Sequence, residues 1–140
     1  MAREVRGSPL RWGTVFQPGL EHIRVWSRVF GPKDRGRQLD AIFDTGTSTT
    51  IIQMEVAAAI GLGPERSLGP CEFRGVHGVE CGYWVRTSRL QTLGRTWHDF
   101  KLACLPIQAD LEVDCLLGLD LLKGLVLTVD FKRGAIELEE

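Results

Sequence analysis

The sequence has no long apolar run and no marked excess of charge of one sign. No stretch of its 140 residues approaches the roughly 20 apolar residues that a membrane-spanning helix needs. Residues 1–10 carry no apolar stretch after their charged residues, which argues against a secretory signal peptide. Seventeen basic and eighteen acidic residues leave a formal charge of -1, which gives no indication of a nucleic-acid or membrane partner. We therefore expect a cytoplasmic protein that binds neither nucleic acid nor a membrane.

The sequence also lacks the residue spacings of a metal site. Its four cysteines contain no Cys-x-x-Cys pair, and its three histidines lie far apart. We expect buried, reduced thiols, because a disulfide would need an oxidising compartment for which the sequence gives no signal. We predict no metal and no cofactor. The residues concerned are Cys71, Cys81, Cys104 and Cys115, and His22, His77 and His98.

Alternation of apolar and polar side chains runs through most of the chain and predicts a mainly β fold. Residues 54–60 are rich in helix formers and stop at Gly61, so we expect a short helix there, with a further helical turn at residues 120–123. Many short strands with one or two short helices fit a small closed barrel or a folded sheet. The expected strands are residues 22–30, 37–43, 49–52, 80–90, 97–105 and 125–131, followed by a terminal hairpin that includes residues 136–138.

One segment carries an arrangement suited to catalysis. The apolar residues 41–43 lead directly into Asp44, which is followed by Thr45, Gly46, Thr47 and Ser48. A carboxylate at a strand end is held rigidly, the glycine allows close backbone approach, and the hydroxyls and amides can donate hydrogen bonds to it. These are the properties of a positioned general base. Asp-Thr-Gly is also a common turn formula, so the tripeptide alone decides little.

The context of this segment resembles the retropepsin-like aspartic proteases. In that family an Asp-Thr-Gly motif follows an apolar strand, and two apolar residues and a glycine come later, before a short helix; here residues 116–122 read Leu-Leu-Gly-Leu-Asp-Leu-Leu. Residues 125–131 resemble the strand that follows in bacterial members, and residues 75–78 lie where the family places its flap. The resemblance implies a retropepsin-like domain over residues 13–140, preceded by a flexible arm at residues 1–12.

The resemblance implies three groups of site residues. In the catalytic group, the Asp44 carboxylate would act on the substrate, the Thr45 hydroxyl would bond across a twofold axis to its mate, and Gly46 would form the tight turn. A second group would lie near the substrate, and a third would pack behind the catalytic loop. The second group is Thr47, Ser48, Val76, His77 and Gly78, and the third is Leu116, Leu117 and Gly118.

One departure from the viral members concerns an ion pair. Viral members commonly place an acid shortly after the catalytic motif and pair it with an arginine just after the apolar-apolar-Gly segment. Ser48 and Leu119 stand at those positions here, so both partners are missing together. This suggests a cellular or bacterial relative.

The sequence supplies one such aspartate, whereas the chemistry needs two. No other aspartate is followed by Thr-Gly or Ser-Gly, and two close carboxylates must share one proton to work as acid and base. We therefore predict a homodimeric aspartic endopeptidase that cleaves a peptide or protein substrate with a water activated by the paired Asp44 carboxylates. The terminal strands are a candidate for part of the interface. A non-catalytic dimeric binding or assembly module on the same fold remains the alternative, since fold does not fix function.

Overall fold

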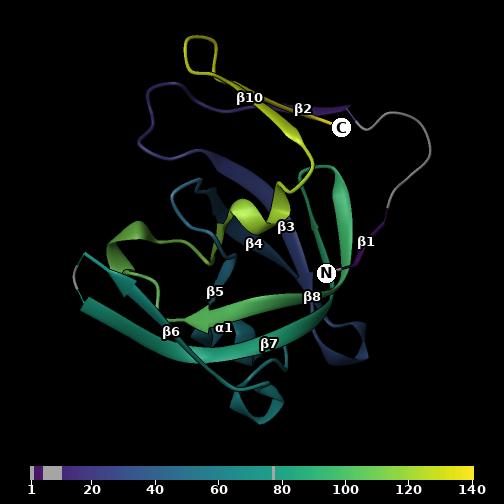
Figure 1. Cartoon of the computed structure of the whole chain (residues 1–140), viewed down its shortest axis with the longest axis vertical. Helices are drawn as coiled ribbons and strands as arrows, with labels where there is room; N and C mark the ends of the chain where they lie inside the picture. The colour runs from purple at the N-terminus through teal and green to yellow at the C-terminus, as the bar shows by residue number, and fades with distance from the viewer. Residues whose placement is uncertain (1, 5–10, 77) are drawn as a thin grey trace.

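A computed structural model describes residues 2–4, 11–76 and 78–140, and these residues form mainly β structure (Figure 1). Within them, eight strands form one sheet in the order β1-β8-β5-β9-β4-β3-β7-β6, and three form another in the order β10-β11-β2. The strands are β1 (Ala2–Glu4), β2 (Arg11–Val15), β3 (Arg24–Phe30), β4 (Gly36–Phe43), β5 (Ile51–Gln53), β6 (Pro70–Gly75), β7 (Gly78–Thr92), β8 (Arg95–Leu105), β9 (Cys115–Leu117), β10 (Val126–Asp130) and β11 (Ala135–Glu139).

The larger sheet folds back on itself. Strand β7 pairs with β3 along one part of its length and with β8 along most of it, so the two sides of the sheet are joined without forming a clean barrel. The helical part of the described residues is one short α-helix, α1 (Met54–Ala59), and four 3-10 turns: η1 (Pro32–Asp34), η2 (Pro64–Arg66), η3 (Ala109–Leu111) and η4 (Leu119–Leu121). The prediction of a mainly β fold with short helices is confirmed, in its folded-sheet form.

The apolar side chains that alternate with polar ones along the strands fill two adjoining cores. Val25 and Val29 of β3 are buried in the larger core with Leu39 of β4, as the period of two predicts. The smaller core contains Ile51 and Leu105. Burial of each such side chain contributes about 1.5–3 kcal/mol. Leu116, which packs against the smaller core, pairs with Ile42, two residues before Asp44.

The N-terminal segment pairs with the rest of the fold where it is described. Residues 2–4 pair with β8, and Arg11 and Trp12 belong to β2, which pairs with β11. The sequence predicts that both belong to the flexible arm at residues 1–12. The domain boundary at residue 13 stays a prediction.

The four cysteines are free thiols, and one of them corrects the sequence prediction. Cys71, Cys104 and Cys115 are buried as expected, but Cys81 is exposed. Strand β7 extends past the core at this end to form a hairpin with β6, and Cys81 lies opposite the exposed Glu72 on its outer face. Apolar character in the sequence does not reveal which residues of such a hairpin overhang the core.

The difference in burial between Cys81 and the other three cysteines predicts the number of reactive thiols. Burial raises the pKa of Cys71, raises that of Cys104 to about 12, and raises that of Cys115 further, so these three stay protonated and inaccessible at neutral pH. We expect an aromatic disulfide reagent to modify one thiol in the native protein and four in denaturant. Cys81→Ser should remove the native reaction; rapid native modification of more than one thiol would contradict the buried placement.

Candidate active site

Asp44 lies immediately beyond β4, where that strand runs parallel to β9. Ala41, Ile42 and Phe43 pair with Cys115, Leu116 and Leu117. The Asp44 N–H donates to the Leu117 carbonyl at 3.0 Å. The structure thus brings the Asp-Thr-Gly and Leu-Leu-Gly segments side by side, although they are far apart in the sequence.

The turn after β4 fixes the Asp44 carboxylate. The Gly46 N–H donates to Asp44 Oδ1 at 2.8 Å, and the Thr47 N–H donates to the Asp44 carbonyl at 3.4 Å. A Cβ atom on Gly46 would lie 3.0 Å from Asp44 Oδ1, so a side chain there would crowd the carboxylate. Asp44 is half-buried, and Thr45 and Gly46 are exposed. The carboxylate is therefore held in place on an accessible surface.

Gly118 packs directly against this loop from behind. A Cβ atom there would lie 2.6 Å from the Thr49 carbonyl carbon and 2.7 Å from its oxygen, so no larger residue fits without moving the loop. Beyond it, the Leu119 N–H donates to the Thr47 carbonyl at 2.9 Å and the Asp120 N–H to the Ser48 carbonyl at 3.2 Å. The backbone of the Leu-Leu-Gly segment supports the whole turn.

A carboxylate that the sequence analysis did not assign to the site completes this support. Asp120 accepts two hydrogen bonds from the buried Thr50, one from its N–H at 2.9 Å and one from its hydroxyl at 2.7 Å. The Thr50 hydroxyl oxygen in turn accepts the Gly118 N–H at 3.1 Å. Asp120 is the acid within the otherwise apolar segment 116–122, and this placement was the signal in the sequence. A half-buried carboxylate needs hydrogen-bond donors around it.

An apolar cavity of about 310 Å³ lies between the β6–β7 hairpin and the sheet. Phe73, Val76 and Gly78 line it from the hairpin, and Ile51 and Leu116 line it from the sheet. Val76 is almost fully exposed at the hairpin turn, whereas His77 lies outside the described residues. Thr47 and Ser48 do not line this cavity; they contact the η4 segment through their carbonyls instead.

The described part of the chain shows no grouping of three or more His, Cys, Asp or Glu side chains that could hold a metal ion. It also contains no helix with the length and apolar character to cross a membrane.

The sequence profile described as "gag-polyprotein putative aspartyl protease" matches residues 35–124, which include Asp44, the hairpin and Gly118. The chain belongs to this family. No curated protein matches the sequence. Among solved structures, a retropepsin-like aspartic protease from Rickettsia conorii is similar at a TM-score of 0.66 and 15% identity, over 97% of each chain. The retroviral protease-like domain of Ddi1 from Leishmania major is similar at a TM-score of 0.56 and 20% identity, over 84% of this chain and 87% of that one.

These similarities confirm the retropepsin-like resemblance and the fold that it implies. At such identities the structural neighbours show the fold alone.

Proposed function

We propose that this family member is an aspartic endopeptidase that works as a homodimer, with one Asp44 carboxylate from each copy. The supporting observation is the placement of Asp44, which is fixed by the Gly46 N–H, remains accessible, and follows Ile42 by two residues, the strand partner of Leu116 in the wall of an apolar cavity under a hairpin. Two such carboxylates facing one another would share a proton and titrate as a pair. The ionised member would take a proton from water while the protonated member donates to the substrate carbonyl.

The second carboxylate has to come from another chain. Asp120 belongs to the same loop network, but both of its oxygens accept hydrogen bonds from Thr50, so its contacts support a structural role behind the loop. A twofold dimer repeats the same patch on both sides of its axis. It would therefore bring two copies of Asp44 together, each with the same supporting loop.

The apolar cavity supports a peptide substrate in extended form. Strands β6 and β7 form its outer wall, and their backbone could pair with an added strand while apolar side chains of the substrate fill the cavity. Closure of the hairpin over the peptide would exclude bulk water from the reaction. The hairpin is thus proposed as the flap.

The proposed dimer gives a prediction about Thr45. This exposed residue makes no hydrogen bond through its hydroxyl within the described residues, which leaves the hydroxyl available to the partner. We expect sedimentation velocity to show a dimer at micromolar concentration and Thr45→Val to raise the dissociation constant about tenfold, as for loss of a hydrogen bond whose partner remains buried.

Ser88→Ala, which removes a β7 hydroxyl that donates to the Phe30 carbonyl of the same chain at 3.3 Å, serves as the control and should leave the association unchanged. A wild-type protein that sediments as a monomer at the highest attainable concentration would contradict the proposed mechanism.

A further inference from the structure

A second cavity, of about 300 Å³, lies beside the apolar one and is lined by cations. Arg86 of β7, Lys101 of β8 and Lys123 after η4 all contribute to it, together with Trp84 and Thr49. The three basic side chains are exposed. We call the site formed by Arg86, Lys101 and Lys123 the basic pocket.

The basic pocket and the apolar cavity share a wall. Phe73 lines the apolar cavity and Trp84 lines the basic pocket, and their ring centroids are 5.9 Å apart. Ile51 also lines the first and Thr49, two residues away in the chain, lines the second. Side chains two residues apart on one face of an extended peptide are about 6.8 Å apart. A peptide with one side chain in the apolar cavity can therefore reach the basic pocket with another.

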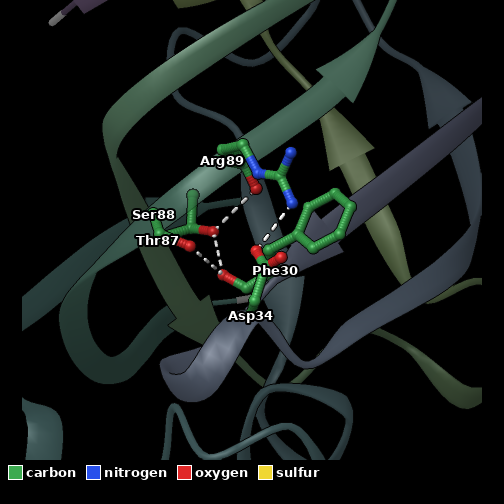
Figure 2. Close-up of polar contacts among 5 residues, drawn as sticks. All are labelled: Phe30, Asp34, Thr87, Ser88 and Arg89. Atoms are coloured by element: carbon green, nitrogen blue, oxygen red, sulfur yellow. Dashed lines mark hydrogen bonds and ion pairs between the residues drawn. The ribbon is translucent and has the colours of Figure 1, made fainter.

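The cations of the basic pocket have no carboxylate partner within the described residues. Arg89, three residues further along β7, provides the contrast: its guanidinium pairs with Asp34 at 2.6 Å and lies over the Phe30 ring (Figure 2). Arg86, Lys101 and Lys123 form no such ion pair in the described chain. Asp120 also borders the pocket and contributes one negative charge. Three cations against this one carboxylate leave the pocket with an excess of positive charge.

Two of these cations are placed in a way that does not favour folding. Arg86 and Lys101 lie directly opposite one another across β7 and β8, and like charges at such positions are destabilising. Other contacts hold them there: Arg86 donates to the Asp99 carbonyl at 2.9 Å, and the Lys101 ammonium lies 4.4 Å from the Trp84 ring centroid. The arrangement favours an anion that approaches both.

We infer that the basic pocket is a substrate subsite for an acidic side chain, two residues from the apolar side chain that fills the neighbouring cavity. This inference rests on the proposed peptidase function and names its substrate class: extended peptides that combine an apolar residue with Glu or Asp at this spacing. Each exposed ion pair is weak and salt-dependent, so the three cations together should give a preference of several-fold.

The test compares peptides that carry Glu or Gln two residues before or after a single leucine. We expect wild type to cleave one of the Glu peptides with a kcat/KM about three- to tenfold above that of its Gln counterpart, with the preference lost at about 0.5 M salt.

The double variant Lys101→Glu, Lys123→Glu should reverse the preference. Lys132→Glu, which makes the same charge change on the turn between β10 and β11, should retain it. Lys123→Glu alone, at a residue whose side chain forms no ion pair in the described chain, provides a variant that should fold and weaken the preference.

Binding of the same peptides to Asp44→Asn, measured by fluorescence anisotropy, separates this inference from the proposed function. Tighter binding of the Glu peptide without any cleavage by wild type would overturn the peptidase but support the pocket. Equal binding and equal cleavage of Glu and Gln peptides, or a preference that survives the double variant, would overturn the pocket and leave the peptidase standing.

Discussion

Asp44→Asn is expected to abolish peptide cleavage, with a loss of at least about 10³-fold in kcat, while the protein keeps its fold and its dimer. An asparagine has nearly the same shape, and its amide oxygen can still accept the Gly46 N–H that now binds Asp44 Oδ1 at 2.8 Å. What disappears is the ionisable group that would take the proton from water. The measurement is turnover of a mixed peptide library from acidic to neutral pH, with circular dichroism and sedimentation on the same samples.

Asp34→Asn is the matched control. It removes one carboxylate charge from the exposed η1 turn, where Asp34 pairs with Arg89, and it should change turnover less than twofold because the pair is exposed and weak. Cleavage by wild type that persists in Asp44→Asn would remove Asp44 from the mechanism. A folded dimer with no cleavage in either protein would instead favour the non-catalytic binding or assembly module.

Asp120→Ala is expected to lower the free energy of unfolding by about 3 kcal/mol, because each hydrogen bond to a charged group contributes about 1.5–3 kcal/mol and two are lost. The substitution leaves the N–H and hydroxyl of the buried Thr50 without their acceptor. Asp120→Asn keeps one carbonyl acceptor and should cost about 1 kcal/mol. Urea unfolding followed by tryptophan fluorescence gives both values.

The control for this series is Asp110→Ala, at an exposed position in η3, which should change stability by no more than about 0.5 kcal/mol. Asp120→Ala should also reduce turnover, because the loop that carries Asp44 depends on Thr50 and Gly118 for its position. If Asp120→Ala and Asp110→Ala unfold at the same urea concentration, the Thr50–Asp120 contact does not support the loop.

The sequence predicted those features that depend on local pattern. The alternation of apolar and polar side chains predicted β3, β4 and β10. The apolar run before Asp44 predicted that this residue lies at a strand end. A run of helix formers stopped by Gly61, which adopts a left-handed φ of 88°, located α1. These signals lie in residues that are close together in the sequence, so they can be read without knowledge of the fold.

The remaining features depend on strand register, which the sequence does not display. Thr50 meets Asp120 because β5 runs antiparallel to β9, with Ile51 opposite Leu116. Arg86 meets Lys101 because of the register of β7 and β8. Partners this far apart in the chain become neighbours only after the sheet has formed. Neither the support of the loop that carries Asp44 nor the basic pocket could therefore be predicted from the sequence.

The exposed Cys81 makes the hairpin open to spectroscopy without any engineered residue. A nitroxide spin label attached to this thiol would sit on β7 near the hairpin turn, while the three buried thiols stay unlabelled. In a twofold dimer the two labels form a single symmetric pair, so pulsed electron resonance would return one distance distribution for each state of the hairpin. The width of that distribution, with and without a bound peptide, would report directly how far the hairpin moves.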